Sequence, residues 1–178
     1  MSSLEEAAQR VQRGDASAFR AIVEATAPRL VRLSARIMGS VTEAEDVVQD
    51  AYVKAYRALV DGQFDARSSV STWLHRIVVN ASLDARRKHK HDPKDALPDS
   101  GASPAQVATA EEALALRELA GWLDELPDDQ RTALLLKTVE GMSSGEIAAI
   151  LGCSEGAVEQ RLVRARATLR ERREKGPS

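Results

Sequence analysis

Residues 143–166 read SSGEIAAILGCSEGAVEQRLVRAR, two helical segments separated by Gly152. Ser143 and Glu146 predict a capping box, in which a hydroxyl and a carboxylate satisfy N–H groups at the start of a helix. Gly152 is suited to end this short helix, and a longer one follows directly. The stretch therefore predicts a helix-turn-helix unit, which places its second helix in the major groove of DNA with the N-terminal residues at the base edges.

The second helix of this unit carries small and polar residues first and arginines afterwards. The early residues can reach base edges, whereas guanidinium groups suit phosphates. The base-edge candidates are Glu155, Gly156, Ala157, Glu159 and Gln160, and the phosphate candidates are Arg161, Arg164 and Arg166. A helical hairpin inside a bundle that never contacts DNA is the alternative.

A second amphipathic stretch, residues 71–90, reads STWLHRIVVNASLDARRKHK. Its apolar positions form one helical stripe, and beside it runs a polar stripe of Arg76, Asn80, Asp84 and Arg87. An Asn can read a base edge, and the basic run that follows would hold phosphates in a salt-dependent way. The polar loop before it, residues 64–71, could form a pocket for an unstacked base. A solvated helix end, with cations favoured by the helix dipole, explains the same residues without DNA.

The stretch TEAEDVVQDAYVKAYRALV at residues 42–60 predicts a further helix, with a capping box from Thr42 to Glu45. Its outward stripe mixes carboxylate, amide, apolar and basic groups: Asp46, Gln49, Asp50, Val53, Lys54 and Arg57. Acidic and amide groups do not suit DNA, so this face suits a protein partner with a basic helical surface. An ordinary solvated face is the alternative.

The composition of the 178 residues favours packed helices, because aromatic residues make up only 3% while apolar residues make up 43%. We expect an all-α fold of two small helical domains, residues 1–91 and 111–178. Residues 92–110, rich in Pro, Ser and Asp, predict an extended, mobile and acidic linker. Within the first domain, Asp15 predicts a helix start, Pro28 the first turn of the next helix, and Ser71 or Thr72 the start of the basic helix.

No stretch has the length of apolar sequence that a membrane span needs, and the polar N-terminus does not resemble a signal peptide. The lone Cys153 cannot form an internal disulfide, so we expect a cytoplasmic protein without membrane insertion. Motifs for nucleotide, zinc and cofactor binding are absent, and we expect no catalytic residue, cofactor or metal site. His89 and His91 are interpreted as part of the basic run, and Cys153 as a small packed residue.

Taken together, these motifs resemble those of the extracytoplasmic-function (ECF) sigma factors, the small two-domain members of the bacterial sigma-70 family. The matching elements are D-V-V-Q-D-A-Y, F-x(8)-W-L-x-R-I-x-x-N, a basic run, a linker, L-P-x-x-x-R and the helix-turn-helix. They cover nearly the whole chain in the family's order. The resemblance implies a non-enzymatic subunit that binds core RNA polymerase and directs it to promoters through −10 and −35 elements.

The resemblance also implies a role for each candidate surface. Contacts with the clamp helices of the polymerase β′ subunit fall on Asp46, Gln49, Asp50, Val53, Lys54 and Arg57. Melting and reading of the −10 element fall on Phe64, Arg67, Ser68, Ser69, Arg76, Asn80, Asp84, Arg86, Arg87 and Lys88. Reading of the −35 element falls on the helix-turn-helix residues given above, with Ser154 added.

Further partners are implied as well. They are the polymerase β flap and an anti-sigma factor that covers both domains. The linker would thread toward the active centre and the RNA exit channel, where its acidity could mimic nascent RNA. In the holoenzyme the protein would associate with the nucleoid.

One residue departs from the family pattern, since many members carry a basic residue where this chain has Glu159. Glu can accept from cytosine N4 or repel phosphate, which leaves the −35 sequence open. Two other classes of protein fit parts of the sequence. A response-regulator-type activator would share the helix-turn-helix but needs an α/β receiver or ligand-binding domain, and a helical adaptor would leave the basic helix ends without a use.

Overall fold

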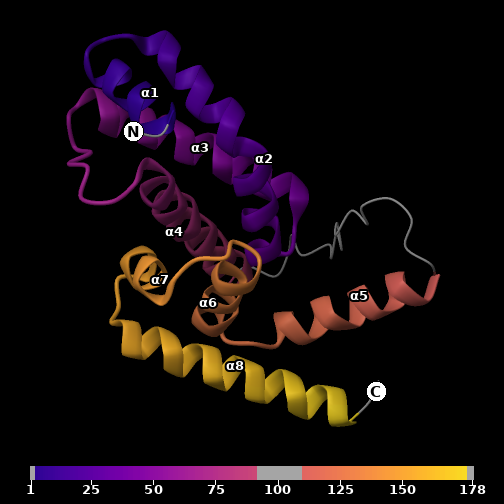
Figure 1. Cartoon of the computed structure of the whole chain (residues 1–178). Helices are drawn as coiled ribbons and strands as arrows, with labels where there is room; N and C mark the ends of the chain where they lie inside the picture. Colours follow the sequence, from indigo (N-terminus) through magenta and orange to yellow (C-terminus); the bar gives the residue numbers. More distant parts are fainter. Residues whose placement is uncertain (1–2, 92–109, 176–178) are drawn as a thin grey trace. The chain divides into compact units, whose positions relative to one another are not determined.

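Apolar residues at helical spacing fold into the elements drawn in Figure 1, a computed structural model that describes residues 3–91 and 110–175. Over these two ranges every regular element is helical. The chain divides into two compact units, residues 1–96 and 97–178. The expected linker, apart from Ala110, lies outside the described residues.

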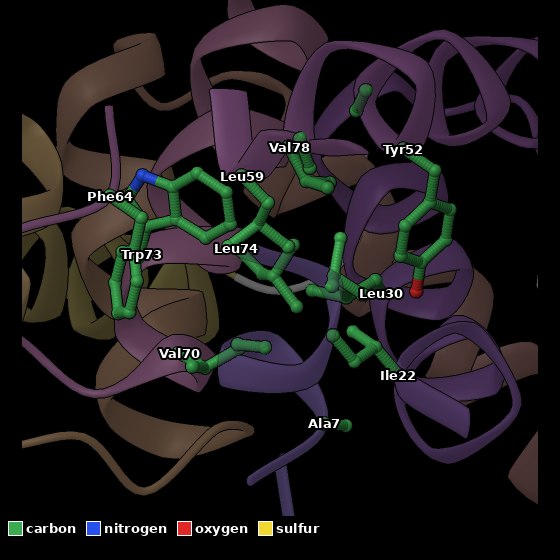
Figure 2. Packing of buried hydrophobic residues seen from close by; sticks show 14 of the residues in the cluster. Ala7, Ile22, Leu30, Tyr52, Leu59, Phe64, Val70, Trp73, Leu74 and Val78 are labelled. Carbon is green, nitrogen blue, oxygen red and sulfur yellow. The ribbon is translucent and has the colours of Figure 1, made fainter. Parts of the chain in front are cut away.

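The first unit contains α1 (Ser3–Gln12), a short 3-10 helix (Ala16–Ala18), α2 (Phe19–Met38), α3 (Val41–Val60) and α4 (Val70–His91). Its four α-helices contribute to one buried cluster, which Figure 2 shows through Ala7 of α1, Leu30 of α2, Leu59 of α3 and Leu74 of α4. Each fully buried leucine contributes about 1.5–3 kcal/mol. These helices thereby form a fixed frame for whatever their outer faces present.

Three expected helix boundaries in this unit are wrong. Pro28 lies inside α2 and not in the first turn of a new helix. A proline there removes one backbone hydrogen bond. The helix nevertheless continues, because Ile22 before Pro28 and Leu30 after it are both buried in the same core.

The other two boundaries lie one or two residues earlier than expected. α3 starts after Ser40, whose backbone is extended and whose side-chain oxygen accepts the N–H of Glu43, so Thr42 is a helical residue and not the cap. α4 starts at Val70, because the Ser69 hydroxyl accepts the N–H of Thr72 at 3.1 Å. Asp15, by contrast, is the N-cap of the 3-10 helix, as predicted for a residue at a helix start.

The second unit contains α5 (Ala110–Asp124), α6 (Asp128–Thr138), α7 (Ser144–Leu151) and α8 (Glu155–Lys175). The predicted capping box of Ser143 and Glu146 is present, and Gly152 ends α7 in the left-handed region at φ +64°. α6 and α7 pack on α8 around Leu136, Ile147 and Leu162, all fully buried. The predicted helix-turn-helix is therefore confirmed. Among the described helices of both units, none is long and apolar enough to cross a membrane.

Candidate protein and nucleic-acid interfaces

The outer face of α3 is a continuous, mixed-charge surface. All six residues predicted from its stripe are exposed: Asp46, Gln49, Asp50, Val53, Lys54 and Arg57. On the opposite side the Tyr52 hydroxyl lies 2.6 Å from Thr26 Oγ1 of α2, and burial raises the pKa of Tyr52 above its ordinary value. α3 is thus held by apolar packing and by this hydrogen bond, and its outer residues are exposed on a helix that is fixed in place.

An exposed valine that the sequence-based interpretation left out extends this face. Val60 is 52% exposed and lies seven residues after Val53, which is 48% exposed. Residues at this spacing share one helix face. Helical periodicity could have identified Val60. It was omitted because Val60 is the last residue of the helix, where the helix boundary is hard to predict from sequence.

The polar loop at residues 64–71 is anchored at its first residue. Phe64 is 9% exposed and its ring lies 4.9 Å from that of Trp73, so this side chain belongs to the core. Arg67, Ser68 and Ser69 are exposed. Asp65 accepts both the backbone N–H of Arg67, at 3.2 Å, and its guanidinium Nε, at 2.9 Å. Ala66 between them adopts φ +56°, an uncommon conformation for a residue other than glycine.

The polar stripe of α4 lies on the surface, as its spacing predicts. Arg76, Asn80, Asp84 and Arg87 are all exposed, and Arg87 Nη1 lies 3.4 Å from Asp84 Oδ1. Lys88 is exposed next to them. Hydrogen-bond donors, an amide and cations that can bind phosphate therefore share one helix face. Groups of these kinds read and hold a nucleic-acid strand.

Arg86 departs from this arrangement. It is only 8% exposed, and its Nη1 donates to the carbonyls of Ile37 at 3.1 Å and Met38 at 3.3 Å. Carbonyls in the last turn of a helix lack intrahelical partners, so Arg86 completes the C-terminal end of α2. Its expected place in a surface cluster with Arg87 and Lys88 is thus wrong. The spacing gave a signal, because Arg86 lies four residues after the buried Ser82 and seven after the buried Val79.

In the helix-turn-helix, the start of α8 is largely exposed. Glu155, Gly156, Glu159, Gln160, Arg164 and Arg166 are exposed, and Ala157 is half-buried. The Ser154 hydroxyl is committed to the helix end, where it accepts the N–H of Ala157 at 3.2 Å. Two glutamates extend toward the start of α7: Ser144 Oγ donates to Glu159 Oε1, and a Cβ added at Gly145 would lie 3.1 Å from Glu155 Oε1.

Arg161, predicted as a phosphate contact, is tied inside its own unit. Its side chain is 26% exposed, Nε lies 2.9 Å from Asp129 Oδ2 of α6, and Nη1 lies 3.0 Å from the Cys153 sulfur. Cys153 is half-buried, in keeping with a small packed residue. Val163, which the prediction omitted, is 63% exposed one turn after Glu159 and adds an apolar group to the same face.

Comparison with known proteins assigns a family to each half of the chain. Residues 22–91 match sigma-70 region 2, and residues 112–169 match sigma-70 region 4. The chain is 35% identical to the RNA polymerase sigma-H factor of Pseudomonas aeruginosa, over 89% of this chain and 87% of that one. It is 33% identical to the ECF RNA polymerase sigma factor SigW of Bacillus subtilis, over 92% of each.

Two solved structures resemble the fold. CnrH, solved in complex with the cytosolic domain of CnrY, matches with a TM-score of 0.72 and 30% identity over 96% of both chains. The sigma factor RpoE of Bartonella quintana, solved with the anti-sigma factor NepR, matches with a TM-score of 0.70 and 28% identity, over 86% of this chain and 94% of that one. In both, the matched protein was captured with a protein bound to it.

Proposed function

This chain belongs to the sigma-70 family, in its ECF group, and from that premise we propose which of its surfaces carries out each step of promoter-specific initiation. A sigma factor is not an enzyme: it binds core RNA polymerase and directs it to promoters. The observation that supports the assignment most directly is that regions 2 and 4 match separate units in the family's order. Each unit presents exposed polar faces at the matched positions.

We assign core polymerase binding to the outer face of α3. Asp46 and Asp50 supply negative charge one turn apart, and Val53 supplies apolar area beside them. Such a face complements a basic helical surface, which we take to be the clamp helices of the β′ subunit. The second unit would contact the β flap. The protein thus acts with RNA polymerase in the cell interior, and in the holoenzyme it would associate with the nucleoid.

We assign the −10 element to the loop at residues 64–71 and the polar stripe of α4. The exposed residues Arg67, Ser68 and Asn80 supply donors and acceptors for an unstacked base, and Arg87 and Lys88 supply phosphate contacts. Phe64 anchors the start of the loop to the core through the contact of its ring with Trp73. Because Arg86 binds the end of α2, its role is to position α4 and not to contact phosphate.

We assign the −35 element to α8. Glu155, Gly156, Ala157, Glu159 and Gln160 lie in its first two turns, where a recognition helix meets base edges. Arg164 and Arg166 follow as exposed phosphate contacts, with Ser154 as the helix cap and Arg161 as an internal tie. We further propose an anti-sigma partner, since both solved neighbours carry a bound protein and the second is named as an anti-sigma factor.

Run-off transcription with bacterial core polymerase tests the polymerase-binding assignment. We expect discrete transcripts that require the protein and are lost in the Asp46→Arg/Asp50→Arg variant, which reverses the charge of the α3 face. The matched control is Glu24→Arg/Glu171→Arg, the same change at two exposed carboxylates elsewhere, and it should transcribe normally.

Two other results would redirect the assignment. Normal transcription by the α3 variant would move polymerase binding to another surface. Polymerase-free binding of a dimer to a palindromic site, without any transcript, would instead favour a helix-turn-helix activator.

A further inference from the structure

α1 precedes the segment that matches sigma-70 region 2, which begins at residue 22. It nevertheless contacts both ends of the loop at residues 64–71, which we assign to the −10 element. At the first end, Gln12 Nε2 donates to the carbonyl oxygen of Phe64 at 3.1 Å. At the second end, Glu5 Oε1 accepts the backbone N–H of Val70 at 3.0 Å. These bonds join residues 52 and 65 positions apart, so a single helix spans the whole loop.

Both bonds satisfy backbone groups that the loop itself leaves open. Val70 is the first residue of α4, where N–H groups have no intrahelical partner and a negative charge is favoured by the helix dipole. Phe64 precedes the turn in which Ala66 adopts φ +56°, and the Phe64 carbonyl oxygen accepts a hydrogen bond from the Gln12 side-chain amide. α1 therefore binds the main chain of the loop, independently of which side chains the loop carries.

α1 is itself fixed by the core and acts as a rigid support. Ala7, Ala8 and Val11 are buried in the cluster that also contains Phe64 and Trp73, several of which are labelled in Figure 2. Residues 65–69, between the two anchored ends, are all exposed. The loop is thus held at its base and open at its tip, which is the arrangement of a preformed receptor.

We propose that α1 is a clamp that holds this loop in the shape that receives an unstacked −10 base, with Glu5 and Gln12 as positioning residues. The inference rests on the proposed role of the loop in −10 recognition. A loop ordered in advance loses less conformational entropy when it binds, and it distinguishes bases better because it cannot adjust to the wrong one. Loss of the clamp should therefore reduce base discrimination without removing polymerase binding.

Each variant changes one of the two positioning side chains. Gln12→Met keeps the length of the side chain but has no donor for the Phe64 carbonyl, and Gln12→Glu lacks the donor while adding a charge. Glu5→Ala removes the acceptor for the Val70 N–H, whereas Glu5→Gln keeps a side-chain oxygen in its place. Gln12 is exposed, so its substitution leaves the core intact.

The assay uses holoenzyme and forked promoter templates whose −10 non-template strand is single-stranded, with each base substituted in turn. The readout is the ratio of affinities for the preferred and substituted templates. A net hydrogen bond of about 1 kcal/mol corresponds to roughly a fivefold change, so Gln12→Met, Gln12→Glu and Glu5→Ala should each lower this ratio about three- to tenfold. Glu5→Gln should stay near wild type, and affinity for core polymerase should be equal in all variants.

The possible failures are distinguishable. If the wild-type holoenzyme shows no base preference and no run-off transcript, the proposed function itself fails. If wild type discriminates and the Glu5→Ala/Gln12→Met double variant discriminates equally well, the clamp is refuted. A defect in Gln12→Glu without one in Gln12→Met would assign the effect to charge near DNA and also refute it. A parallel fall in polymerase affinity and melting temperature would assign α1 a purely structural role.

Discussion

The neighbouring residues Arg86 and Arg87 show how one step along a helix changes the role of a cation. Arg86 is buried against two carbonyls of α2, and Arg87 is exposed beside Asp84. In sequence both belong to one basic run, and composition alone gives them one role. The difference follows from helical rotation, which places Arg86 in line with the buried Val79 and Ser82 and turns Arg87 toward solvent.

This contrast predicts opposite phenotypes for two matched substitutions. Arg86→Met leaves the α2 carbonyls without their charged donor and should lower the free energy of unfolding by about 2 kcal/mol in urea titrations. Arg87→Met should leave stability within about 0.5 kcal/mol of wild type. Because we assign Arg87 to a phosphate contact, Arg87→Met should weaken holoenzyme binding to promoter DNA and reduce the salt dependence of that binding by about one counterion. Equal stability of the two variants would contradict the assignment.

At the scale of single elements, the sequence predicted the helices better than their ends. The capping box of Ser143 and the helix end at Gly152 depend only on local sequence, and both predictions are confirmed. The prediction for Pro28 is wrong because the effect of proline on α2 is overridden by the burial of Ile22 and Leu30, which is a tertiary effect. The prediction for Thr42 is wrong because Ser40, two positions earlier, is an equally good cap, and only the extended backbone of Ser40 distinguishes the two.

The site surfaces follow the same division. The outer stripes of α3 and α4 could be predicted because periodicity alone sets which residues are exposed. The support from α1 could not, because the bonds of Glu5 and Gln12 join residues far apart in the sequence. The partners of Arg161 could not be predicted either, since Asp129 lies on another helix.

The pairing of α7 with α8 predicts how this factor selects its −35 sequence. Glu159 is exposed in the second turn of α8 and its Oε1 accepts from Ser144, which fixes a carboxylate at a position that we assign to base reading. A carboxylate can only accept, so it favours cytosine N4, whereas Gln pairs with adenine N6 and N7. Selection of randomised −35 sequences by holoenzyme should therefore yield cytosine at one position for wild type and adenine there for Glu159→Gln.

Two further variants complete this test. Ser144→Ala removes the hydroxyl that holds Glu159 and should weaken the preference at that position without replacing it by another. The control is Glu171→Gln, the same chemical change at an exposed residue of α8 outside its first turns, and its selected sequence should match that of wild type. An unchanged sequence in Glu159→Gln would mean that this side chain faces the phosphates and not the bases.

At the scale of the whole chain, 25 basic and 27 acidic residues give a net charge of −2, so broad attraction to DNA is weak. Exposed cations nevertheless lie on both surfaces assigned to promoter elements, Arg87 and Lys88 on α4 and Arg164 and Arg166 on α8. Strong promoter binding then requires docking on polymerase and the simultaneous use of both units. A covalent connection between them supplies an effective concentration that separate pieces lack.

This dependence on the connection predicts the effect of cutting the chain between the units. A protease site inserted between residues 96 and 97, where the two units divide, should leave the uncut factor as active as wild type. After cleavage, each unit keeps its own buried core, around Leu30 in the first and Leu136 in the second, and should stay folded by circular dichroism. Run-off transcription at dilute factor should nevertheless fall by about 10²-fold, because the second unit must bind from solution.

Adding excess second unit to the cut factor should restore transcription on promoters with a −35 element and have no effect where that element is scrambled. Full activity of the cut factor at dilute concentration would show that the units act together without needing the chain that joins them.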